Sequence, residues 1–170
     1  MRPSRMMAIA TTLLLAVASA SAAELSNRDK DYLRERASLF MADVRAGELA
    51  SHKAQTELVR AFAYRLVNDH KRSLEHIRKL AAARKVELPA APSERDLKTV
   101  TELEGVTGTR FDKRYIERAI RQHKAGTKAD RQRSQGSKDP ELRALATASF
   151  EVEDLHLALA NRALANVPVE

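Results

Sequence analysis

Three histidines and two carboxylates combine the residue types and the helical spacing of a metal site. His70, His123 and His156 each fall on the apolar stripe of a different expected helix, and Asp43 holds the matching place on another. Glu153 stands three residues before His156, which gives the Glu-x-x-His pattern of di-iron helical bundles. Neutral imidazoles with carboxylates suit Fe, Zn, Mn or Cu. These five residues, Asp43, His70, His123, Glu153 and His156, are therefore the candidate ligands of a divalent transition metal.

A complete di-iron site is not expected. The position three residues before His70 is Val67, and Asp69 should point about 100° away from His70 around the helix. The sequence also lacks H-E-x-x-H, G-x-S-x-G and a glycine-rich phosphate loop. We expect no haem and no nucleotide, and a non-enzymatic protein rather than an enzyme.

A metal-free polar core is the alternative interpretation of the same histidines. An unsatisfied buried polar group costs about 1–3 kcal/mol, so each imidazole needs a partner. Hydrogen bonds to Asp43, Ser149, Thr127 or water would supply partners and fix the helix register. The sequence leaves the metal site and the metal-free network both open. The remaining histidines, His52 and His76, are expected to be solvated.

Long helices must position these residues. Aromatic residues make up 4% of the chain, and no alternating β-branched run supports a strand. Apolar residues at helical spacing predict four long helices and a short one. The long helices run from Ser26 or Asn27 to about Ala54, from Thr56 to about Lys85, from Phe111 to about Arg131, and from Pro140 to before Pro168; the short one runs from Ser93 to about Gly105. The predicted fold is an all-α four-helix bundle with a short extra helix in the crossover between the second and third long helices.

The N-terminus has the pattern of a cleavable signal peptide over residues 1–22. Arg2 and Arg5 precede an apolar run at 6–17, and Ala20, Ser21 and Ala22 match the small-residue cleavage pattern. The run is too short to span a bilayer. We predict export to the periplasm or the extracellular space, as a soluble or peripherally membrane-associated protein. A lead-in at 23–32 and a bundle at 33–166 would follow.

The basic charge of the chain is concentrated in the third long helix. The sequence pI is about 9.9, and the segment from residue 110 to 133 contains nine basic and three acidic residues. Predicted export argues against nucleic acid as a partner. An outward stripe could contact an anionic envelope surface or an acidic protein, although a simply solvated face explains it as well. The stripe consists of Arg114, Arg118, Arg121, Lys128 and Arg131.

Together these motifs resemble the DUF4142 family of exported bacterial proteins. The resemblance extends from about residue 33 to 164 and rests on segments of all four long helices, which are Ala42-Asp43, Leu66-Val67-Asn68-Asp69-His70, Phe111-Asp112 with Tyr115 and His123, and Asp139-Pro140-Glu141-Leu142 with His156. It implies a ferritin-like fold and an envelope location, and no settled activity. The family usually has glutamate where this chain has Asp43.

Overall fold

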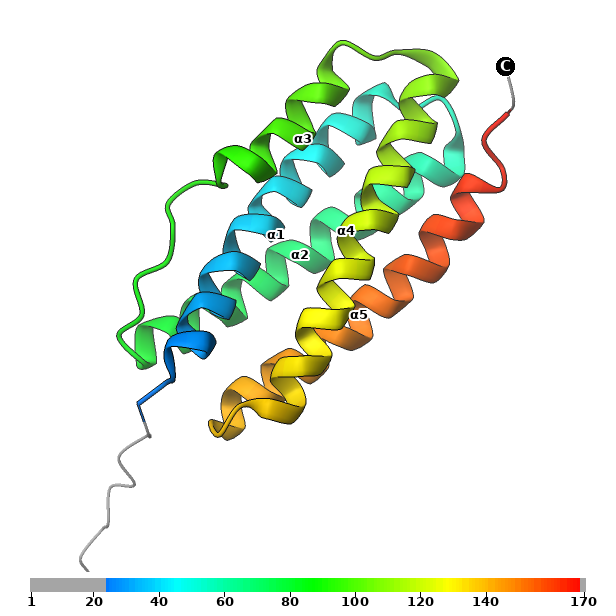
Figure 1. Ribbon diagram of the computed structural model, residues 1–170. Helices are drawn as coiled ribbons and strands as arrows, with labels where there is room; N and C mark the ends of the chain where they lie inside the picture. Colours follow the sequence, from blue (N-terminus) through cyan, green and yellow to red (C-terminus); the bar gives the residue numbers. More distant parts are fainter. Residues whose placement is uncertain (1–23, 169–170) are drawn as a thin grey trace, which may run out of the picture.

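The computed structural model describes residues 24–168 and is all-helical over that range. Four long helices and one short helix follow one another along the chain (Figure 1). They are α1 (Asn27–Lys53), α2 (Glu57–Ala83), α3 (Glu94–Glu104), α4 (Gly108–Gly136) and α5 (Pro140–Leu164). The all-α prediction and the short helix between the second and third long helices are confirmed. The predicted signal peptide at residues 1–22 lies outside the described residues.

Side-chain caps start three of the helices where the sequence predicts a start. The Ser26 hydroxyl accepts from the backbone N–H of Asp29, and Asp139 accepts from that of Leu142. Ser93 caps α3 in the same way. Each bond satisfies a backbone N–H that has no partner within its own helix. The start of α1 at Asn27 places the second half of the predicted lead-in inside the bundle.

The start of α2 after Thr56 is confirmed, whereas the predicted limits of α4 need correction. Thr56 stands at the N-cap of α2, but its side chain makes no capping bond. Instead, the backbone N–H groups of Gln55 and Thr56 donate to the buried carboxylate of Asp112, at 3.0 and 2.7 Å. The fourth helix begins at Gly108 rather than Phe111 and continues to Gly136. The connection between α4 and α5 therefore consists of residues 137–139 only.

The long helices pack as a bundle, with α3 on the outside (Figure 1). The most extensive contacts run between α1 and α2 and between α4 and α5; α2–α5 and α1–α4 contacts close the bundle, and α3 lies against α1. Gly47 lets α1 and α2 approach closely, because a Cβ there would come within 2.6 Å of Val67 Cγ2. No helix within residues 24–168 has an apolar stretch suited to crossing a membrane.

A polar layer divides the core into two apolar clusters. One cluster gathers around Phe62, Leu66 and Phe111, and the other around Leu33, Phe40 and Ile77. Between them lie charged and imidazole side chains that are at most 4% exposed, namely Arg36, Asp43, Asp69, His70, Arg118, His123, Asp130, Glu153 and His156. Burying so many polar groups is costly unless they satisfy one another or a ligand. The layer is therefore the candidate functional site.

Candidate metal centre

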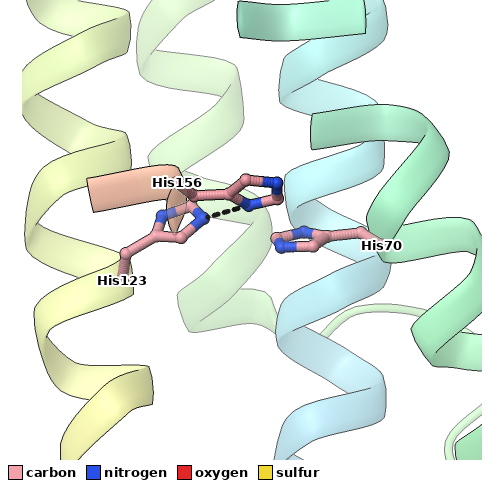
Figure 2. A group of neighbouring side chains, drawn as sticks. All are labelled: His70, His123 and His156. Atoms are coloured by element: carbon pink, nitrogen blue, oxygen red, sulfur yellow. Dashed lines mark hydrogen bonds between the residues drawn. The ribbon is translucent and has the colours of Figure 1, made fainter. Parts of the chain in front are cut away.

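Three imidazoles meet in the polar layer, one each from α2, α4 and α5. The ring centroids of His70, His123 and His156 are 5.1–5.4 Å apart, and all three side chains are fully or almost fully buried. One ring nitrogen from each lies within 4.8 Å of the other two. Figure 2 shows the rings turned toward one another from separate helices. The convergence expected from the sequence is therefore present for the three histidines.

Each imidazole also has an acceptor on its outer side. Nδ1 of His123 lies 2.7 Å from the Ala119 carbonyl oxygen, and Nε2 of His156 lies 3.0 Å from Oδ2 of Asp69. Nδ1 of His70 lies 3.5 Å from Oδ2 of Asp43 without forming a hydrogen bond. Metal-ligating histidines commonly donate their second N–H to a carbonyl or carboxylate, as His123 and His156 are placed to do, which leaves the other nitrogen lone pair facing the metal.

The acceptors of His123 and His156 determine which ring nitrogens carry protons. The Ala119 carbonyl requires a hydrogen on Nδ1 of His123, and Asp69 requires one on Nε2 of His156. When both rings are neutral, Nε2 of His123 and Nδ1 of His156 then both carry lone pairs and face each other at 3.0 Å, whereas one extra proton on the pair makes this contact a hydrogen bond. A metal ion held between the two neutral rings would remove the repulsion between the lone pairs.

The spacing of these nitrogens suits a common ligand. Two nitrogens bound at about 2.0–2.1 Å to one ion lie about 2.9–3.4 Å apart for bond angles between 90° and tetrahedral. The His123–His156 separation of 3.0 Å falls within that range. Both ring nitrogens of His70 are buried without a hydrogen-bond partner in the described chain. A shift of about 1–1.5 Å would bring His70 to ligand distance.

Burial keeps the imidazoles neutral, which is the form that binds a metal. Burial lowers the pKa of His156 to about 4. Burial and the neighbouring histidines push the pKa of His70 well below its usual value. The pKa of His123 is also lowered, again mainly by burial. Near neutral pH the rings therefore act as lone-pair donors rather than as cations.

The two predicted carboxylate ligands lie beside the imidazoles rather than among them. Asp43 pairs with Arg118 at 2.8 Å and places its free oxygen near His70, so it is placed to orient that ring. Glu153 is bound by the guanidinium of Arg36, and its second oxygen has no hydrogen-bond partner. The nitrogens that converge come from the three histidines alone.

Arg36 belongs to a second group of buried charged side chains next to the imidazoles. It contacts Glu153 and lies 3.2 Å from Asp130, which also accepts a 2.8 Å hydrogen bond from the Tyr32 hydroxyl. Burial raises the pKa of Glu153 to about 7 and that of Asp130 to about 6. With Arg118 paired to Asp43, both buried guanidiniums are neutralised by carboxylates. The layer therefore does not present a net positive charge to an incoming cation.

Asp69 and Arg36 are the site residues that sequence reasoning missed. Asp69 was expected to point away from His70, and it does so, but this direction takes it to His156 on α5. A signal existed, because Asp69 continues the spacing of Phe62 and Leu66. Arg36 likewise lies between Leu33 and Phe40 at helical spacing. Of the metal-free partners considered, Thr127 turns away and donates to the Lys124 carbonyl.

Arg118 does not belong to the outward basic stripe, contrary to the sequence prediction. Its side chain is 4% exposed, and it reaches inward to Asp43 and to Thr99 of α3. A carboxylate buried on α1 and a hydroxyl on α3 draw it inward. The other four stripe residues do face solvent, namely Arg114, Arg121, Lys128 and Arg131.

Comparison with known proteins identifies the family and the fold. The sequence profile of the DUF4142 family, a domain of unknown function, matches residues 14–163, whereas no protein with a curated description matches. The chain is similar to the crystal structure of a DUF305 fragment from Deinococcus radiodurans, with a TM-score of 0.75 and 10% identity over 84% of this chain and 99% of that one. It is also similar to a conserved hypothetical protein from Mycobacterium tuberculosis, with a TM-score of 0.67 and 17% identity over 84% and 94% of the two chains. At these identities the structures show a shared fold alone. Since the family profile covers most of its length, the protein belongs to the DUF4142 family.

Proposed function

We propose that this protein binds one divalent transition-metal ion between His70, His123 and His156. The observation that carries the proposal is the convergence of one nitrogen from each of three buried imidazoles within 4.8 Å. Nε2 of His123 and Nδ1 of His156 are 3.0 Å apart, and the nitrogens of the neighbouring His70 ring have no hydrogen-bond partner. Asp69, Asp43 and the Ala119 carbonyl orient the three rings from outside. Three nitrogen ligands from a rigid bundle favour Zn, Cu or Fe over Mn, which prefers oxygen ligands.

The proposed role is binding or storage of the metal rather than catalysis on an organic substrate. The imidazoles are buried, and the groove of about 460 Å³ beside them is lined by Asp69 but not by His70, His123 or His156. The N-terminal pattern of residues 1–22 supports an envelope location, where such a protein would hold a metal outside the cytoplasm. A ferritin-like relationship remains a prediction from the family resemblance.

Elemental analysis of the purified protein tests the proposal. After incubation with Zn²⁺, Cu²⁺ or Fe²⁺ and gel filtration, the wild type should retain about one ion per chain. A His70→Gln, His123→Gln variant should lose it while keeping its helical circular dichroism. His52→Gln, His76→Gln is the matched control, since both of these histidines are exposed. Equal retention in the two double variants would reject the site.

A second proposed function is contact with an anionic surface through the exposed basic face of α4. The four exposed stripe residues, Arg114, Arg121, Lys128 and Arg131, support it. Each basic residue near an anionic surface contributes about 1 kcal/mol, so four can produce measurable, salt-sensitive association.

A further inference from the structure

A groove between α2 and α5 opens beside the polar layer. It has a volume of about 460 Å³ and is lined from α2 by Asp69, Arg72 and His76 and from α5 by Ala148, Ser149 and Val152. The Arg72 side chain is 67% exposed, so the groove reaches solvent. Apart from Glu141 the α5 wall is small or aliphatic, and the α2 wall carries Asp69 and His76, whose side chains are of types that can ligate a metal.

Asp69 connects this groove with the buried imidazoles. Its side chain is only 4% exposed, yet it lines the groove, and its Oδ2 lies 3.0 Å from Nε2 of His156. Two arginines on the same helix cover the carboxylate from the solvent side. Nε of Arg65 lies 2.6 Å from Oδ2, and Arg72 pairs with Oδ1. Asp69 therefore contacts the triad on one side and solvent-exposed cations on the other.

A second groove between α2 and α5 has no carboxylate in its lining, which consists of Leu58, Ala61, Phe62, Arg65, Leu159, Arg162 and Ala163. It approaches the triad through Phe62, whose ring centroid is 6.0 Å from that of His156. A hard hydrated cation gives up its water most readily where protein oxygen ligands replace it. A carboxylate that already contacts a ligand histidine supplies that replacement, and an aromatic ring does not.

We propose that the groove lined by Asp69 is the access route of the metal ion, with Asp69 as the transfer ligand. This inference rests on the proposed metal site. On this route Asp69 would exchange its ion pair with Arg72 for an entering cation, with its carboxylate oxygen replacing a water ligand. Asp69 would then release Nε2 of His156, so that this ring can turn and the three histidines can hold the ion. Arg65 and Arg72 re-form their ion pairs with Asp69 and close the route.

Blocking the groove tests the route separately from the site. Ala148→Trp fills the groove from its α5 wall, whereas Ala158→Trp places the same ring on an exposed position of α5 outside it. Zn²⁺ uptake and release are followed by stopped flow with a chromogenic zinc indicator. Ala148→Trp should slow association and dissociation by about tenfold or more with an unchanged Kd, and Ala158→Trp should match the wild type.

Removing one of the two arginines that cover Asp69 gives an independent test that does not disturb the core. Arg72→Gln removes a cation from beside Asp69 and should speed Zn²⁺ association about fivefold at low salt, because one surface charge is worth about 1 kcal/mol at this range. Arg78→Gln, an exposed arginine on α2 outside the groove, is the charge-matched control.

Unchanged rates in both Ala148→Trp and Arg72→Gln, or slowing only by Ala61→Trp in the neighbouring groove, would overturn the route. A wild type that binds no Zn²⁺ would instead overturn the metal site itself.

Discussion

Gly126 leaves the space that the buried ion pair of Arg36 and Glu153 occupies, so replacing it with alanine should destabilise the protein. A Cβ at residue 126 would sit 2.1 Å from Oε2 of Glu153 and 2.8 Å from Nη1 of Arg36. Ordinary contact begins at about 3.4 Å, so the carboxylate would have to move by about 1 Å. Both side chains are at most 3% exposed and have little room to move.

The expected size of the effect follows from two opposing contributions. Alanine in a helix interior is favoured over glycine by about 1 kcal/mol. Disrupting a buried ion pair costs about 3–5 kcal/mol. Gly126→Ala should therefore lower the free energy of unfolding by about 2–4 kcal/mol, although helix propensity alone predicts a gain.

Urea unfolding of the metal-free protein, followed by circular dichroism at 222 nm, measures the effect. Gly105→Ala is the control, because a Cβ at Gly105 would meet nothing within 4 Å, and its change should stay within about 0.5 kcal/mol. In a Glu153→Ala background the clash with the carboxylate disappears, and adding Gly126→Ala should cost far less. A simple gain of about 1 kcal/mol in the wild-type background would refute the packing described for the polar layer.

Three further predictions concern the imidazoles, the acid response and the surface. Asp69→Asn removes the carboxylate that orients His156 and should weaken Zn²⁺ affinity about 10–100-fold by calorimetry, whereas equal affinity would remove Asp69 from the site. The unfolded chain protonates His156 near pH 6.5 and the folded protein only near pH 4, so this residue's contribution to stability is lost as the pH falls through that window. Between pH 7 and 5 the metal-free wild type should lose about 2 kcal/mol relative to His156→Gln in denaturant titrations, and parallel pH profiles would contradict the lowered pKa. Reversing Arg114, Arg121 and Lys128 to glutamate should abolish sedimentation with anionic vesicles at low salt, and undiminished binding would reject the basic face as a docking surface.

The helices and the convergence of three histidines could be predicted from the sequence. Apolar residues at helical spacing fix the inward face of each helix, and His70, His123 and His156 lie on those faces near mid-helix. In a bundle of long, nearly parallel helices this is enough to bring the side chains to one depth. The caps at Ser26, Ser93 and Asp139 fixed three helix starts for local reasons that need no tertiary contact.

The residues that surround the three imidazoles could not be predicted. Their positions depend on rotations of each helix about its axis by a few tens of degrees and on partners far along the chain. On α5 the buried face includes Ala146, Glu153 and Ala160, whereas the larger apolar residues one position earlier, Leu145, Val152 and Leu159, are only half-buried. Arginine by itself indicates a surface position. Arg118 is buried because Asp43, 75 residues away in sequence, meets it across the bundle.

X-ray absorption spectroscopy of the metal-loaded protein tests the central claim most directly. The three-histidine site predicts about three imidazole nitrogens at about 2.0–2.1 Å from a Zn²⁺ or Cu²⁺ ion, with the outer-ring scattering typical of imidazole. The His70→Gln, His123→Gln variant should retain too little metal after gel filtration to give this signal. A shell of oxygen ligands alone, or a spectrum unchanged by that double substitution, would show that His70, His123 and His156 form a metal-free hydrogen-bond network instead.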